Sequence, residues 1–273
     1  MSRRKRSIFK ERKKINYKLI FAVLLLMCAA VLLISYAISA IVSQKNELYD
    51  QGVEYYDAGS YQEAIDSFKA ALAENQLFSK KKDQNTKLYL ADSYLKSAQY
   101  AEAADTYKDL VDSSYSGSNV KDLQELASAM DDFSMGNYGG ALDVLLKQAE
   151  KYPELYMYVG TCYAVTDDSE NMFASYEKYV QTFGFNSYVY AMYGSYYMNN
   201  GDMESSIAYI MNGLDCNDKV YRKELIMLEI TYYEKQEDYD KAYELASQLV
   251  SEYPDYEIGQ MEYTFLSTRV SEQ

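Results

Sequence analysis

The residues that could do chemistry in this sequence are carboxylates and three cysteines, because the chain contains no histidine. Without histidine, the Ser-His and Cys-His pairs that activate a nucleophile cannot form, and histidine metal sites are excluded. Neither a G-x-S-x-G turn nor a glycine-rich phosphate loop occurs in the sequence. We therefore expect a protein that is not an enzyme and that binds no cofactor and no metal.

Two adjacent acid pairs, Asp131-Asp132 and Asp167-Asp168, are the remaining candidates for acid-base work or for a Ca²⁺ site. No loop around them has the alternating oxygen ligands and the closing glutamate of a calcium loop, so both are interpreted as solvated turns. Cys28 lies within an apolar run, where a packing role is expected. Cys162 and Cys216 fall at positions not expected to approach within the roughly 4.4–6.8 Å Cα separation of a disulfide.

The elements that position these residues are pairs of amphipathic helices. Residues 47–76 read as two such helices around a turn at residues 57–61. Gly52 and Ala64 allow the two backbones to approach closely, and Tyr55 and Phe68 fill the volume around the crossing. A single pair cannot bury both of its faces, so it requires copies of itself stacked alongside.

Copies of this pair recur along the chain. The mid-helix positions equivalent to residue 52 are 91, 129, 160, 194 and about 230, with spacings of 39, 38, 31, 34 and about 36. This pattern resembles the tetratricopeptide repeat family, whose period is ~34 residues with glycine, tyrosine and alanine at fixed offsets. The fourth copy departs most, because Met172 stands at the alanine position and residues 167–169 replace the glycine turn; the fifth has Ser206 at the alanine position.

The resemblance implies an all-α fold, a right-handed solenoid of about six helix-turn-helix repeats over residues 43–254. Residues 78–86 and 112–119 read as polar connecting loops, which account for the two longest spacings. Residues 255–273 are predicted to be a capping helix and tail. Ile258, Met261 and Phe265 lie on one face of that helix, which we expect to cover the last repeat.

The resemblance also implies a concave groove, formed by the first helix of each repeat, for a protein or peptide partner. The projected stripe is more apolar than charged, which suits an adaptable apolar peptide. Tyrosine is unusually frequent, with 32 residues, and serves either packing or the groove. Several of the stripe residues are core residues instead if the projection is off by one position. The candidate groove residues are Tyr49, Val53, Tyr56, Leu88, Asp92, Leu95, Leu126, Met130, Phe133, Met157, Thr161 and Met198.

The N-terminal region is of a different kind. Residues 1–18 form a basic tail with nine basic residues and one acid, and residues 19–42 are 24 uncharged, mainly apolar residues. That length spans a ~30 Å hydrocarbon core. Because the basic residues lie only before the run, the positive-inside rule predicts a single-pass membrane protein with a cytoplasmic N-terminus and extracytoplasmic repeats. A cleavable signal peptide, cut near residues 37–39, is the alternative.

The remainder of the chain is strongly acidic. It holds 18 of the 27 basic residues and 40 of the 41 acidic residues, a net charge of −22. Such a surface repels the phosphate backbone, so binding of nucleic acid by the repeats is not expected.

Taken together, the sequence predicts a membrane-tethered scaffold that holds another protein outside the cytoplasm. By resemblance to small single-pass proteins of this repeat family, a role in secretion or envelope assembly is the expectation. Two alternatives stay open: a structural protein that self-associates, and an ectodomain whose tyrosines stack on cell-wall glycans.

Overall fold

The computed structural model describes residues 17–74, 79–115, 117 and 119–270, without the side chains at 17–24, 37, 38 and 40–43. Most of the predicted basic tail, residues 1–16, and the last three residues therefore lie outside the described part. The described residues form thirteen α-helices and one short 3-10 helix, with no strand among them. The all-α prediction is confirmed.

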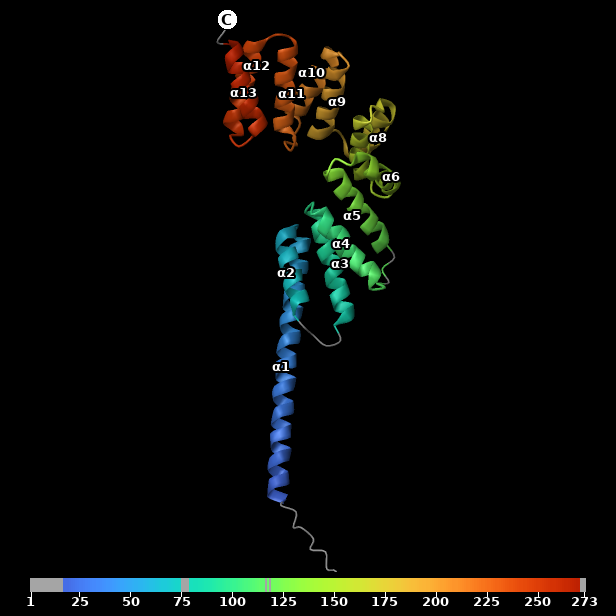
Figure 1. Ribbon diagram of the computed structural model, residues 1–273, viewed down its shortest axis with the longest axis vertical. Helices are drawn as coiled ribbons and strands as arrows, with labels where there is room; N and C mark the ends of the chain where they lie inside the picture. The colour runs from blue at the N-terminus through green and yellow to red at the C-terminus, as the bar shows by residue number, and fades with distance from the viewer. Residues whose placement is uncertain (1–16, 75–78, 116, 118, 271–273) are drawn as a thin grey trace, which may run out of the picture. The chain divides into compact units, whose positions relative to one another are not determined.

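Helices follow one another in pairs joined by short turns (Figure 1). The six pairs are α1 (Tyr17–Asp57) with α2 (Tyr61–Ala73), α3 (Lys80–Lys96) with α4 (Tyr100–Asp112), α5 (Val120–Ser134) with α6 (Tyr138–Ala149), α7 (Tyr156–Val165) with α8 (Ser169–Phe183), α9 (Ser187–Asn199) with α10 (Met203–Asp215), and α11 (Arg222–Lys235) with α12 (Tyr239–Glu252). The 3-10 helix η1 (Pro153–Leu155) precedes α7, and α13 (Glu257–Val270) follows the sixth pair. These are the six predicted repeats.

Each pair turns at a residue with left-handed backbone geometry, which lies seven positions after the mid-helix position of its repeat. The φ angles are between 56° and 80° at Gly59, Ala98, Gly136, Asp167, Gly201 and Glu237. Only glycine adopts this conformation without steric cost. The turn geometry is therefore constant, while the residue that adopts it is glycine in three repeats only.

In the first and fourth repeats, the two helices cross where a glycine meets an aromatic ring sixteen positions later. A Cβ added to Gly52 would lie 2.5 Å from Phe68 Cε1, and one added to Gly160 would lie 2.5 Å from Tyr176 Cε1. Phe68 and Tyr176 are fully buried. Close backbone approach and an aromatic filler, expected from the first repeat, are thus found again in the fourth.

The repeats that depart from the sequence pattern still pack. Met172 is buried at the position where other repeats have alanine. Ser206 is also buried there, and its hydroxyl donates a hydrogen bond of 2.8 Å to the carbonyl of Gly194. Because that hydroxyl is satisfied internally, serine replaces alanine without leaving an unpaired polar group.

The chain divides into two compact units, Met1–Ala127 and Ser128–Gln273. In the first unit, α2 packs between α1 and α3, and α4 packs against α3. A buried lysine ties these elements together: the Lys45 ammonium lies 2.6 Å from the Asp83 carboxylate and donates to the Glu74 carbonyl at 2.9 Å. The predicted polar loop at 78–86 is shorter than expected, because α3 already begins at Lys80.

Helix α1 continues far beyond its contact with α2 (Figure 1). Side chains in this part of α1 are exposed and mostly apolar, and they include Leu25, Leu26, Met27, Val31, Leu32, Leu33, Ile34 and Tyr36. Among the described residues, no helix meets the combined criteria of length and apolar character for crossing a membrane.

In the second unit, α7 packs against α8, α9 against α10, and α12 lies between α11 and α13 (Figure 1). The core over α11–α13 contains Ile230, Leu249 and Leu266. Here the predicted capping face is wrong. Leu266 and Gly259 are the buried residues of α13, whereas Ile258, Met261 and Phe265 are exposed.

Candidate functional site

The first-helix face of the first unit, formed by α1 and α3, carries a cluster of tyrosines. Tyr89 lies at its centre, with its ring edge-on to Tyr56 at 5.3 Å and to Tyr49 at 6.0 Å between centroids. It also stacks on the buried Phe68 ring at 5.6 Å. All three tyrosines are half-buried, so one side of each ring is held by the core and the remainder faces outward.

Two ionisable groups on this face, Asp92 and Tyr56, have raised pKa values. The Asp92 carboxylate is half-buried and accepts a hydrogen bond from the Tyr107 hydroxyl. Burial raises the pKa of Asp92, against the opposing effects of that hydrogen bond and of Lys96. Burial also raises the pKa of Tyr56 to about 12, with Asp92 adding to the shift. Tyr56 is therefore neutral at physiological pH.

The other predicted groove residues of the first unit share this position. Val53, Leu88 and Leu95 are half-buried and pack against the core beside the tyrosines. In contrast, Leu126 is buried, with 7% of its surface exposed.

The first-helix face of the second unit, formed by the first helices of its pairs, contains a network of hydroxyl groups. The Thr161 hydroxyl donates to the Met157 carbonyl at 3.0 Å and lies 3.3 Å from the Tyr176 hydroxyl. It also hydrogen-bonds to Tyr188, which comes from α9. Burial raises the pKa of both Tyr176 and Tyr188. These hydroxyls are therefore protonated donors that lock α7, α8 and α9 together.

Two further predicted residues on this unit, besides Thr161, are half-buried. Met157 sulfur lies 3.7 Å from the Asn186 amide nitrogen, and the Phe133 ring is edge-on to Tyr138 and Tyr158 at 5.2 and 5.1 Å. Met130 and Met198 are buried, with 5% and 4% of their surfaces exposed. Met130, Met198 and Leu126 are therefore core residues, which is the alternative that the sequence left open.

A cavity of about 360 Å³ lies where α7 ends and α8 begins, beside α9. The buried Met172 and the half-buried Met192 contribute apolar surface, and Ser195, Asn199 and Asn200 supply polar groups. This mixed lining fits a peptide side chain with a polar end better than a small-molecule reaction site.

The sequence projection missed Tyr89, Tyr158 and Tyr188. Tyr89 and Tyr158 each follow a predicted residue directly, at Leu88 and Met157, so a one-residue rotation of the projection would have found them. The frequency of tyrosine was the available signal. The tyrosines that belong to these faces are the ones that pair with aromatic rings of neighbouring helices, and this pairing is visible only in the structure.

The aspartates and cysteines that were candidates for chemistry have structural roles or lie in structural positions. Asp168 caps α8 by accepting from the Asn171 amide at 3.2 Å, and Asp132 accepts from the Asn137 side chain at 3.0 Å. Cys162 and Cys216 are free thiols, and burial raises the pKa of Cys162 to about 11, which keeps it protonated. No group of three or more potential metal ligands gathers within the described ranges.

Comparison with known sequences identifies the repeat. Family models of the tetratricopeptide repeat match residues 55–126 and residues 230–256. The first match includes α2 to α4, and the second includes the end of α11, the turn that follows it and the whole of α12. No curated protein matches the sequence significantly.

Solved structures share the fold at low identity. A structure of pilF from Pseudomonas aeruginosa is 16% identical with a TM-score of 0.52, covering 84% of this chain and 99% of that one. A tetratricopeptide repeat protein from Parabacteroides merdae is 12% identical with a TM-score of 0.50, covering 82% and 99%. The complex of the TPR2AB domain of yeast Sti1 with pHSP90 has a TM-score of 0.36, too low to carry an argument.

Three observations agree: the constant left-handed turn, the sixteen-residue crossing pair and the two family matches. Proteins built from this repeat generally mediate protein–protein interactions. Residues 55–126 and 230–256 are thus tetratricopeptide repeats, and the described helix pairs share the fold of that family.

Proposed function

We propose that this protein is a membrane-tethered scaffold that holds a protein partner on the extracytoplasmic side through the first-helix faces of its repeats. The observation that carries the proposal is the half-buried tyrosine cluster of Tyr49, Tyr56 and Tyr89. Rings fixed by the core on one side present rigid, neutral surface on the other, which binds a partner at low cost in conformational entropy.

The kind of partner follows from the same face. Its outward groups are rings, aliphatic side chains and a hydrogen-bonded carboxyl, with the Lys82 ammonium 4.9 Å from the Tyr49 ring centroid. Such a mainly apolar face suits an apolar segment of a protein, in extended or helical form.

The tether is argued from the sequence. Residues 19–42 carry no charge, and the basic residues stand only before them. Part of this run, residues 19–24 and 40–42, has side chains outside the described part of the chain. The exposed apolar side chains from Leu25 to Tyr36 support the proposal, because contiguous apolar surface of this kind marks an interaction site. A role in secretion or envelope assembly fits a scaffold at this location.

Site-specific photocrosslinking in native membranes tests the scaffold. A benzoylphenylalanine replaces Tyr56 or Tyr158, both half-buried aromatic positions, and Gln62 on α2 is the exposed control. We expect one discrete partner adduct from Tyr56 or Tyr158 and none from Gln62. Equal faint background at all three positions would contradict partner binding on this face.

Membrane topology needs a separate test. In a chain with Cys28→Ser and Cys216→Ser, a cysteine replaces Ser7 or the exposed Glu63, and intact cells are treated with a membrane-impermeant maleimide. We expect labelling at position 63 and not at position 7. Labelling at neither position before lysis, together with extraction of the protein by alkaline carbonate, would overturn the extracytoplasmic tether.

A further inference from the structure

Helix α13 exposes the apolar stripe that was expected to cap the array. Ile258, Met261 and Phe265 have 58%, 73% and 44% of their surfaces exposed. Their spacing of three and four residues places them on one side of the helix. The opposite side packs on α12 through Leu266, while Gly259 contacts Leu249. The Arg269 guanidinium lies over the Phe265 ring at 5.0 Å, and the three side chains otherwise stay exposed.

The stripe is too small for a tight complex. With about 150–200 Å² for each large apolar side chain, the three expose on the order of 300 Å². A stable complex buries about 800 Å² per partner, so the stripe suits reversible pairing in the micromolar range or weaker.

The charges at the two ends of α13 identify the partner. Asp255 and Glu257 stand at its beginning and Arg269 at its end, all exposed, and none of them forms an ion pair with another described residue. A second α13 in parallel would put like charges together. An antiparallel copy would bring Arg269 of each chain to the acidic end of the other.

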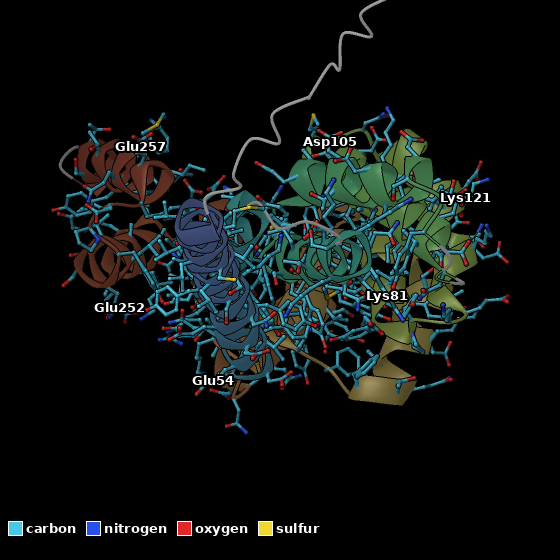
Figure 2. The ribbon with its side chains drawn as sticks, turned by 90° about the horizontal axis from the view of Figure 1, so that it is seen from below. Glu54, Lys81, Asp105, Lys121, Glu252 and Glu257 are labelled. Atoms are coloured by element: carbon cyan, nitrogen blue, oxygen red, sulfur yellow. The ribbon has the colours of Figure 1, made fainter. Side chains whose placement is uncertain are left out.

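The apolar residues are also arranged symmetrically. In an antiparallel pair centred near Met261, Ile258 of one copy lies opposite Phe265 of the other, and the two Met261 side chains meet. Polarisable methionine adapts to such a self-contact. Figure 2 labels Glu257, the first residue of α13, and Glu252, the last residue of the neighbouring α12.

We infer that the α13 stripe is a self-association surface, on which two copies of this chain pair antiparallel through Ile258, Met261 and Phe265. This surface differs from the first-helix faces proposed to hold a partner. It does not depend on the membrane tether, and it uses none of the first-helix residues named above.

The first test measures association of the full chain in detergent micelles by sedimentation velocity. Met261→Glu is compared with Met135→Glu, because Met135 is 72% exposed and lies outside α13, in the turn before α6. We expect Met261→Glu to weaken association at least ~10-fold and Met135→Glu to leave it unchanged. Equal association of both variants, or a monomer throughout, would overturn the inference.

The second test reads orientation. In a chain with Cys28→Ser and Cys216→Ser, Met261→Cys should form an interchain disulfide under mild oxidation, and Met135→Cys should not. Mixed chains with Ile258→Cys and Phe265→Cys should crosslink to each other more than either does to itself. Preferred self-crosslinking at both positions would indicate a parallel pair and contradict the inference.

The third test separates pairing from helix stability. Acids at the start and a base at the end of a helix also suit its dipole. Arg269→Glu should weaken association, and adding Asp255→Lys and Glu257→Lys to the same chain should restore it. If Arg269→Glu lowers only the melting temperature and leaves association unchanged, the charges serve the helix alone and the inference fails.

Discussion

The first and fourth repeats pack their helices in the same way but differ in the turn and on the first-helix face. Gly52 and Gly160 both lie against a ring sixteen residues on. The turn residue is glycine in the first repeat and Asp167 in the fourth. The residue after the crossing glycine is Val53 in one and Thr161 in the other. The helix crossing thus tolerates less variation than the turn or the face, because a buried backbone contact leaves no room for adjustment.

The largest effect is expected at the crossing. Gly52→Ala and Gly160→Ala should each destabilise the protein by about 1–3 kcal/mol, because the new Cβ would overlap a fully buried ring. Urea unfolding followed by circular dichroism measures this. Gly139→Ala is the matched control, since a Cβ there meets nothing within 4 Å and a helical alanine is favoured. Equal behaviour of Gly160→Ala and the control would refute the shared crossing.

The next effect concerns the residue after the crossing glycine. Thr161→Val should cost about 1–2 kcal/mol, because it leaves the Tyr176 and Tyr188 hydroxyls without their shared partner. The reciprocal change, Val53→Thr, should cost under about 1 kcal/mol, since a helical threonine hydroxyl can donate to the carbonyl four residues earlier. Unfolding free energies of the two variants test this asymmetry, and equal costs would disprove it.

A smaller difference is expected at the turn. Gly59→Ala should cost about 1 kcal/mol, because its φ of 77° is strained for a residue with a Cβ. Asp167→Gly should stabilise by less than that, because aspartate adopts the left-handed region more readily than alanine does. Thermal melts of the two single variants provide the measurement. A stabilising Gly59→Ala would show that the turn is not strained as described.

The smallest effect is a pH dependence that the fourth repeat should show and the first should not. Hydrogen bonds from the Asn171 side chain and backbone lower the pKa of Asp168, whereas Ser60 makes no capping bond in the first repeat. A carboxyl whose pKa is lower in the folded state than in the unfolded state stabilises the fold at pH values above its unfolded pKa of about 3.9. This stabilisation is lost as the pH falls through the folded pKa. Asp168→Asn should keep the cap and remove this acid sensitivity. Identical acid unfolding curves for both proteins would count against the capping role.

The helix pairs and their period were predictable from the sequence because the crossing imposes residue types. Gly52, Ala64 and Phe68 return in the second repeat as Ala91, Ala103 and Tyr107. The observed turns fall at a constant distance from the predicted crossings. Even Asp167, which the sequence pattern marks as a departure, occupies the expected turn position. These packing constraints recur at a fixed spacing and act between residues that are close in the sequence, so the sequence alone reveals them.

Helix rotation was less predictable, because neighbouring helices decide which of two adjacent residues is buried. Leu126, Met130 and Met198 are buried, whereas Tyr89 and Tyr158, adjacent to predicted positions, are half-buried on the first-helix faces. On α13 the rotation was reversed: Leu266 fits the surface of α12, and the longer apolar stripe stays outside. Hydrophobicity alone does not distinguish a covered stripe from an exposed one.

The unbroken course of α1 makes the first repeat and the apolar half of the helix one mechanical body. A helix of 41 residues is roughly 60 Å long and resists torsion about its axis. Any rotation of the apolar half about its axis therefore turns Tyr49 and Tyr56 through the same angle. One residue inserted before Lys45 would swing the repeat by about 100° around the helix axis and move it by about 1.5 Å along it. Helical phase, rather than linker length, fixes the direction in which the first repeat faces.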